Sequence, residues 1–485
     1  MKVIRNFIYN MSYQILVLIA PLITVPYISR VLGAEGVGVN TFTNSIIQYF
    51  VLFGSIGITF YGSREIAYVQ TDMVARSKKF WEIEILKIVT ASVSYLFFFI
   101  FLYFYHHFQT YMLYQSVLVV AAGIDISWFY TGLENFKRTV IRNALVKVAG
   151  IILIFSLVKR QSDVGIYILL LSVTQLLGNA SLWPYLRKDI IWPGWSKLNI
   201  FKNFKPAMLL FIPQIAIQIY VVLNRTMLGQ MVSVKSAAYF QYSDQFIKMA
   251  LAITTATGPV LLPRVSHAFA LRQTSKVYDY LRTGFEFVSM LAFPMVFGIV
   301  AIAKKFAPWF MGEQFQPVGS LMILESPIII FIAWSGVIGQ QFLIPTKRVK
   351  QYTTSVTIGV VVNVVLNVVL IYMYQASGAV LATVAAELAV TLYQLACIRN
   401  EINIGRLLRR CWPYLFASVV MYIPVRLIIG TLKISIFSLI LSIAVGIIVY
   451  FSLLIIMRVP MYKLGLEVVR THMKNKNEEK YNSDL

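Results

Sequence analysis

The stretch from Pro21 to Ala67 decides the fold and reads PLITVPYISRVLGAEGVGVNTFTNSIIQYFVLFGSIGITFYGSREIA. Two apolar segments flank a short turn that contains Gly33, Gly36 and Gly38. Each segment has about the 20 residues that a helix needs to cross the hydrocarbon core of a membrane. The stretch therefore predicts two membrane helices joined by a tight, glycine-rich turn.

The composition of the whole chain agrees with a membrane protein. Of its 485 residues 58% are hydrophobic and only 13% are charged, and the mean hydropathy is +0.72. Soluble proteins are about 45–50% apolar and about 25% charged. The net charge of +23 would suggest nucleic acid binding in a soluble protein. Here the basic residues lie in short loops between apolar blocks, so we expect no nucleic-acid partner.

Apolar blocks of about 20 residues recur along the chain and predict an all-α integral membrane protein with about 14 transmembrane helices. The first block has a basic start like a signal peptide, but it is too long and lacks a small-residue cleavage site, so we expect a retained helix. The predicted spans lie near residues 11–32, 39–61, 80–104, 110–132, 139–158, 164–186, 205–230, 236–262, 283–303, 320–344, 352–374, 377–398, 411–431 and 434–457.

The loops between these spans predict the orientation of the chain. With the N-terminus inside, the inner segments carry 31 Lys and Arg residues and the outer segments carry 9. Cytoplasmic loops of membrane proteins are enriched in Lys and Arg. We therefore expect a multi-pass membrane protein with both termini in the cytoplasm.

A polar loop between the sixth and seventh spans divides the chain into two six-helix halves. We expect an N-terminal lobe at 1–190, a C-terminal lobe at 191–400, two further spans at 401–458 and a cytoplasmic polar tail at 459–485. The two lobes are expected to be pseudo-symmetric around a central cavity, because parallel repeats in transporters place the binding site at the repeat interface.

A weak internal repeat supports two lobes and marks basic residues near helix ends. Arg30 and Arg225 differ by 195 positions, and Arg64 and Arg264 differ by 200. Arginine binds phosphate oxygens in a bidentate geometry. We expect these four arginines and Lys248 to give a cationic cavity with cationic mouths, Arg30 and Arg225 outside and Arg64 and Arg264 inside. Orientation alone also places basic residues at helix ends, and long side chains can extend to the interface.

Polar side chains inside the spans predict a hydrated helix face and sites of ion coupling. Polar contacts between helices are the alternative. Local ion pairs are also expected for Glu84 with Lys87 and for Asp244 with Lys248, because residues three or four apart share a helix face. The candidate polar face comprises Asn44, Gln48, Gln218 and Asn363. The candidate coupling carboxylates are Asp125, Asp244, Glu325 and Glu387.

Motifs for catalysis, nucleotides and metals are missing from the sequence. It contains no P-loop, HExxH or CxxC. Its two cysteines, Cys397 and Cys411, predict free thiols rather than a ligand set. We expect no cofactor, no metal and no catalytic residues.

Two stretches carry a resemblance to a known family. These are PYISRVLGAEGVGVNTF with GSREIA in the first two spans, and GIDISWFYTGLENFKRTVIRNALVKVAGIILIFSLVK from Gly123 to Lys159. They resemble the polysaccharide transporter family of the multidrug/oligosaccharidyl-lipid/polysaccharide exporter superfamily. The resemblance implies a flippase, not an enzyme, that moves undecaprenyl-pyrophosphate-linked oligosaccharide repeat units by alternating access for capsular, exo- or O-antigen polysaccharide synthesis. It also implies a location in the bacterial plasma membrane, with the lipid bilayer, polysaccharide polymerase and chain-length machinery as partners.

Three other functions stay open from the sequence alone. A cell-wall precursor flippase is chemically close to the first reading. A drug/cation antiporter of the same superfamily is expected to have a more acidic and apolar cavity. A membrane polysaccharide polymerase needs a large external loop, and the outer loops here are short.

Overall fold

The computed structural model describes residues 2–255 and 258–459, and the predicted polar tail from 460 onward lies outside them. The described residues form helices and contain no β-strand. Nine of their helices are long and apolar enough to cross a membrane, or ten if a pair bent by 44° forms one span. The all-α membrane fold is therefore confirmed, while the number of 14 spans stays a prediction.

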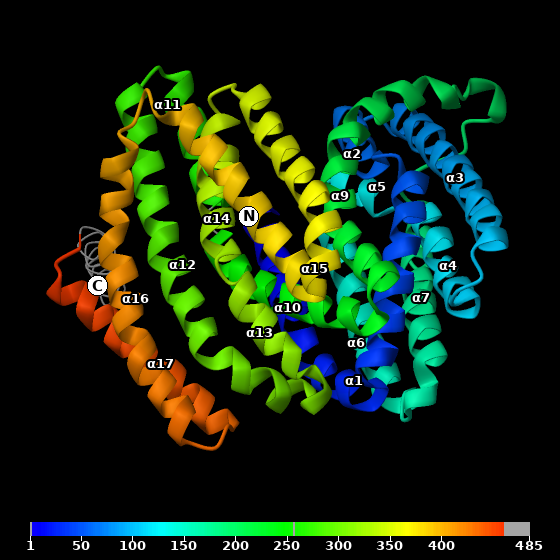
Figure 1. Ribbon diagram of the computed structural model, residues 1–485. Helices are drawn as coiled ribbons and strands as arrows, with labels where there is room; N and C mark the ends of the chain where they lie inside the picture. The colour runs from blue at the N-terminus through cyan, green and yellow to red at the C-terminus, as the bar shows by residue number, and fades with distance from the viewer. Residues whose placement is uncertain (1, 256–257, 460–485) are drawn as a thin grey trace, which may run out of the picture. The chain divides into compact units, whose positions relative to one another are not determined.

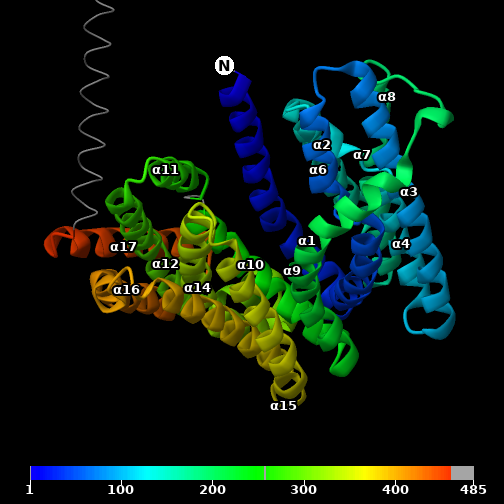
Figure 2. The same ribbon diagram turned by 90° about the horizontal axis from the view of Figure 1, so that it is seen from above.

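The chain divides into two units. Unit 1 comprises Met1–Gln241, Phe310–Phe315 and Asn367–Ala379. Helices α3 and α4 run side by side in this unit (Figure 1, Figure 2). Its helices are α1 (Lys2–Ser55), α2 (Ile58–Tyr68), α3 (Met73–Phe104), α4 (Gln109–Gly123), α5 (Ser127–Gly132), α6 (Phe136–Leu157), α7 (Val164–Ala180), α8 (Trp183–Leu186) and α9 (Phe204–Met231), with the 3-10 turns η1 (Gln161–Asp163), η2 (Trp195–Lys197), η3 (Ile200–Asn203) and η4 (Glu313–Phe315).

Helix α1 breaks at Gly33, which has a φ of 67°. The backbone N–H of Ala34 donates to the side-chain oxygen of Gln314 at 3.0 Å. A Cβ at position 33 would lie only 2.8 Å from that oxygen. Glycine is thus favoured here by its left-handed backbone, and the missing side chain leaves room for Gln314. The predicted break between two helices is therefore found at Gly33, but it does not extend over residues 33–38, because the chain is helical again from Ala34.

Gly38 lies in the helix that follows the break, where it allows close packing and does not form a turn. A Cβ there would lie 2.2 Å from the carbonyl oxygen of Val234, at the start of α10. Backbone cannot move aside as a flexible side chain can. Gly38 therefore sets how closely α1 approaches the first turn of α10.

The aromatic part of the second family-like stretch belongs to one hydrophobic core cluster of unit 1. Trp128, Phe129 and Tyr130 of α5 are at most 2% exposed. Trp128 stacks on Phe80 of α3 with the ring centroids 5.6 Å apart. Each buried aromatic ring removes a large apolar area from solvent. The stretch thus fixes α5 against α3.

Unit 2 comprises Tyr242–Trp309, Gln316–Leu366 and Val380–Leu485, as far as these are described. Helices α16 and α17 pack along each other here, and Phe285 stacks on Trp334 with the ring centroids 4.9 Å apart. Helix α15 bends at Gln375, where φ is 54°, so the boundary predicted between residues 374 and 377 is confirmed. The remaining helices are α10 (Val234–Thr255), α11 (Gly258–Ala270), α12 (Thr274–Met311), α13 (Gln316–Glu325), α14 (Ile328–Ser335), the π-helix η5 (Gly336–Leu343), α15 (Val349–Ile398), α16 (Ile404–Thr431) and α17 (Ile436–Ile456).

Candidate functional site

The two arginines of the opening stretch are both exposed. Arg30 precedes the break of α1, and Gly312 packs against its side chain. Arg64 lies on α2, where it pairs with Glu65 at 3.1 Å and lies 5.6 Å above the ring of Tyr61. These placements are compatible with cationic mouths, which stay a prediction.

The other three predicted cations differ in their surroundings. Arg225 is half-buried in α9 of unit 1, whereas Arg264 is exposed on α11 of unit 2. Arg264 lines a cavity of about 380 Å³ with His267 and Lys276. Lys248 pairs with Asp244 at 2.8 Å, which confirms the local ion pair predicted at this spacing.

Polar residues next to the predicted polar face of α1 take part in contacts between helices. On α1, Asn40 accepts a hydrogen bond from Gln115 of α4 at 3.0 Å. Ser45 accepts one from Thr226 of α9 at 2.9 Å. Asn44 lies on the same stretch of α1 and is half-buried. Residues beside Asn44 thus join helices, while the role of Asn44 itself in a hydrated face stays a prediction.

The other predicted polar residues have diverse environments. Gln48 is half-buried on α1, and Gln218 is exposed on α9. Asn363 is fully buried in α15 and donates to Thr383 at 3.5 Å. Neighbouring Asn367 donates to Asn224 at 2.7 Å. The four residues are thus spread over several environments rather than gathered in one.

The candidate coupling carboxylates are found both inside and at the edge of the packed helices. Glu325 is 1% exposed and accepts a hydrogen bond from Ser243. Glu387 is half-buried on α15. Asp125 is partly accessible, with 35% of its side chain exposed, and lies 3.8 Å from Arg142. Their part in ion coupling stays a prediction.

A buried charged cluster joins α3 to the second family-like stretch. Glu84 and Lys87 form the predicted pair at 2.8 Å, and their side chains are 0% and 4% exposed. Trp128 donates to Glu84 at 3.1 Å, and Lys87 donates to the carbonyl of Asp125 at 2.5 Å. Buried charges persist only when they are paired and hydrogen-bonded. The second family-like stretch therefore holds this cluster together through Trp128 and Asp125. The spacing of residues along the sequence does not reveal this role.

Arg142 extends the same cluster toward α7. It is 8% exposed and donates to the side-chain oxygen of Asn179 at 2.6 Å. Asn179 in turn donates to the carbonyl of Ala121 at 2.7 Å. The chain of contacts connects α4, α6 and α7, and Asp125 ends it at a partly exposed carboxylate.

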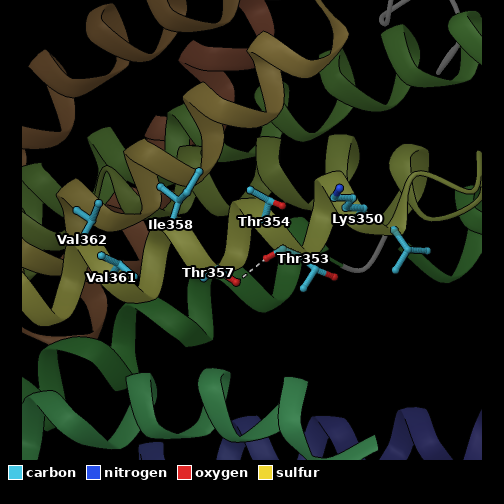
Figure 3. Close-up of a pocket in the computed structure, with 8 residues that line it drawn as sticks. Lys350, Thr353, Thr354, Thr357, Ile358, Val361 and Val362 are labelled. Atoms are coloured by element: carbon cyan, nitrogen blue, oxygen red, sulfur yellow. Dashed lines mark hydrogen bonds between the residues drawn. The ribbon is translucent and has the colours of Figure 1, made fainter. Parts of the chain in front are cut away.

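A groove of about 540 Å³ along α15 is a feature that the sequence analysis missed. Figure 3 shows its lining, with Thr357 donating to the carbonyl of Thr353 at 2.9 Å. The spacing of three and four residues places the lining on one helix face, and this signal was present in the sequence. The lining residues are Val349, Lys350, Thr353, Thr354, Thr357, Ile358, Val361 and Val362.

The face of α15 changes its chemistry along the helix. A cation at Lys350 comes first, hydroxyl groups follow at Thr353, Thr354 and Thr357, and aliphatic side chains follow from Ile358 onward. Such an order suits an amphiphile that has an anionic group, a polar part and an apolar part. The groove can bind such a molecule by charge, hydrogen bonds and apolar contact in turn.

Comparison with known families decides the family of the chain. A profile described as "Polysaccharide biosynthesis protein" matches residues 3–269. The chain belongs to this family. A second profile, "Lipid II flippase MurJ", matches residues 184–457. The resemblance drawn from the two quoted stretches is thereby confirmed.

Individual relatives agree with the family. A protein of Shigella dysenteriae named as an O-antigen transporter is 22% identical over 388 residues, which cover 78% of this chain and 96% of the relative. A protein of the same name from Escherichia coli (strain K12) is 21% identical and covers 82% and 97%. These relatives are transporters, and the chain is a membrane protein of the same family rather than an enzyme.

Solved structures share the fold of this chain. The lipid II flippase MurJ in an inward closed conformation superposes with a TM-score of 0.75 at 17% identity, over 94% of this chain and 99% of that one. An inward-facing multidrug resistance transporter of the MATE family in the MOP superfamily gives 0.61 at 13% identity, over 80% and 96%. At these identities the likeness concerns the fold alone.

Proposed function

We propose that this protein is a flippase that moves a lipid-linked oligosaccharide across the bacterial plasma membrane for polysaccharide synthesis. The observation that carries the proposal is the family match over residues 3–269, together with relatives that are named as O-antigen transporters. The substrate would be an undecaprenyl-pyrophosphate-linked repeat unit of a capsular, exo- or O-antigen polysaccharide. Transport would follow alternating access between an N-terminal lobe at 1–190 and a C-terminal lobe at 191–400.

The groove on α15 supports the substrate class. Lys350 would attract the pyrophosphate, because an ammonium group is a strong donor to phosphate oxygens. The three threonine hydroxyls would exchange hydrogen bonds with sugar hydroxyls. The aliphatic end would contact the isoprenoid chain near the headgroup. Arg30, Arg64, Arg225 and Arg264 would add positive charge along the path.

The test measures polysaccharide export in cells for two double variants, one in the groove and one at Arg30 and Arg64, and for a single control variant. Thr353→Val with Thr357→Val keeps the shape of the groove but removes two hydroxyls, and we expect polysaccharide export to fall several-fold. Thr431→Val is the matched control, because Thr431 is an exposed helical threonine on α16 that also bonds to its own helix. Normal export by the double variant at a normal protein level would contradict the role of the groove. Normal export after replacing both Arg30 and Arg64 by alanine would contradict a role of these two arginines in transport.

A cell-wall precursor flippase is a second candidate, favoured by the MurJ profile match over residues 184–457. Rescue of a strain that lacks its lipid II flippase would support it. Rescue of a strain that lacks its O-antigen flippase, without rescue of the first, would support the main proposal.

Orientation and partners are further parts of the proposal. Both termini would lie in the cytoplasm, as the count of 31 inner and 9 outer basic residues suggests. Reporter fusions at each end, active only on one side of the membrane, would check this. Polymerase and chain-length proteins are the expected partners, and crosslinking in cells would detect them.

A further inference from the structure

One end of unit 2 holds a cavity of about 700 Å³ that the transport proposal does not use. We call it the α11–α12 cavity. Its walls come from the turn between α11 and α12, the segment between η5 and α15, and the turn between α15 and α16, which meet at one end of the unit (Figure 1). Phe269, Val277, Phe342 and Pro345 give it apolar walls.

The charge in this cavity is predominantly positive. Arg272, Lys347 and Arg348 line it, against a single carboxylate, Glu401. Glu401 is already engaged, since Arg348 pairs with it at 2.5 Å and Tyr278 donates to it at 3.1 Å. Among residues 2–255 and 258–459, neither Arg272 nor Lys347 has an ion pair. Two positive charges therefore remain available to a ligand.

Arg348 is held in place before any ligand arrives. Its guanidinium pairs with Glu401 across the cavity wall and lies 5.7 Å from the ring centre of Phe342. A cation fixed in this way loses little side-chain freedom when it binds an anion. The cavity therefore combines one immobile cation with two that can move toward a ligand.

The backbone at the two available cations is in the left-handed region. The φ angles are 56° at Arg272 and 64° at Lys347. Each residue follows a helix end, because Gln273 donates to Ala268 at 2.9 Å and Arg348 donates to Leu343 at 2.8 Å. Glycine is the usual residue at this position of a helix end, since a side chain there is strained. Two strained positions thus carry cations into one cavity.

Attraction to the helix ends explains only part of this arrangement. A cation at a helix C-terminus is stabilised by the carbonyl groups there, which accounts for one basic residue at each end. It does not account for both meeting a third cation in a cavity with aromatic walls. Strained backbone gathers at functional sites, where another gain offsets it.

We propose that the α11–α12 cavity binds a phosphate group, and that its apolar walls suit the phosphate of an anionic lipid. Basic pockets between membrane helices bind lipid headgroups by the same chemistry. A free phosphate or pyrophosphate shares this chemistry, so the experiment separates the two sources. The proposal stands independently of the transported substrate, because none of the α15 groove residues lines this cavity.

The test measures binding to the purified full-length protein in detergent by calorimetry. One arm titrates dihexanoyl phosphatidic acid, with the zwitterionic dihexanoyl phosphatidylcholine for comparison, and the other arm titrates inorganic phosphate and pyrophosphate. The variant is Arg272→Gly with Lys347→Gly, which relieves strain while it removes both cations. We expect unchanged or higher thermal stability and phosphate-group binding that is roughly 10- to 100-fold weaker, as charge-assisted hydrogen bonds are lost.

The control variant is Arg406→Gln with Arg409→Gln, which removes two exposed charges from α16 without touching this cavity. It should bind as the parent does. Loss of binding only in the lipid arm identifies a lipid headgroup, and loss only in the inorganic arm identifies a free phosphate. Equal affinity of the glycine variant and the parent in both arms, or no saturable binding by the parent, would overturn the proposal.

Discussion

The buried pair of Glu84 and Lys87 gives the sharpest prediction, through the change Lys87→Met. Methionine has nearly the same length as lysine but no charge. The change leaves Glu84, whose side chain is fully buried, with the single bond from Trp128 at 3.1 Å. The other carboxylate oxygen of Glu84 has no hydrogen-bond partner within the described part of the chain. In the variant, the buried carboxylate of Glu84 thus lacks the cation that neutralises it in the parent protein.

The cost of this stranded charge follows from the two ways in which the protein can respond. A buried charge that loses its partner destabilises by about 3–5 kcal/mol. Uptake of a proton limits that cost: for an acid whose ordinary pKa is near 4.3, neutralisation at pH 7 costs about 3.7 kcal/mol, at 1.36 kcal/mol for each pH unit. At pH 5 the same step costs about 1 kcal/mol.

The sign of the pH dependence distinguishes this explanation from a simple loss of packing. The folded variant would hold one proton that the unfolded chain releases above about pH 4.3, so lowering the pH should restore stability. We expect a loss of about 3.5 kcal/mol at pH 7, which for a unit of this size lowers the apparent melting temperature by roughly 10 °C. Near pH 5 most of that loss should disappear.

The assay is thermal unfolding of the purified protein in detergent at both pH values. The double variant Glu84→Gln with Lys87→Met has no stranded charge, so it should be more stable than Lys87→Met alone at pH 7. An equal loss at pH 7 and pH 5, or a double variant no better than the single one, would refute the reasoning.

Two further predictions concern packing and a second buried carboxylate. Gly38→Ala should lower thermal stability and protein level, because the added Cβ would lie 2.2 Å from backbone. Gly150→Ala is the control and should be neutral or stabilising, because nothing lies within 4 Å of its Cβ. Equal melting temperatures of the two variants would contradict this prediction. Arg410→Gln should destabilise by about 2 kcal/mol, because it removes the partner 2.8 Å from Glu286, whose side chain is only 6% exposed. Unchanged thermal unfolding would show that the pair contributes nothing.

Local spacing made several features predictable. The pairs of Glu84 with Lys87 and of Asp244 with Lys248 follow from three- and four-residue separations, and both form. The break near residue 375 followed from the end of one apolar block and the start of another. The threonine face of α15 has the same kind of spacing, so a polar helix face could be predicted there from the sequence as well.

Contacts between distant residues escaped prediction for a physical reason. Trp128 reaches Glu84 across 44 positions, and Gln314 reaches the break at Gly33 across 280. Periodicity reports only which face of a helix is buried, not which partner covers it. The glycine-rich turn was therefore placed too broadly, since one glycine breaks the helix and Gly38 serves a packing contact.

The hydrogen bond from Ala34 to Gln314 also has a consequence for the timing of biosynthesis. The break in α1 leaves the ribosome long before the side chain that accepts its N–H exists, because the two residues are 280 positions apart. At about 5–20 residues per second, this interval lasts roughly 14 to 56 s. Throughout it, α1 must remain in the membrane with its N–H at residue 34 bound to water, lipid or another partner. If the ribosome stalls before residue 314, the backbone N–H of Ala34 therefore still lacks the side-chain oxygen of Gln314 as its acceptor.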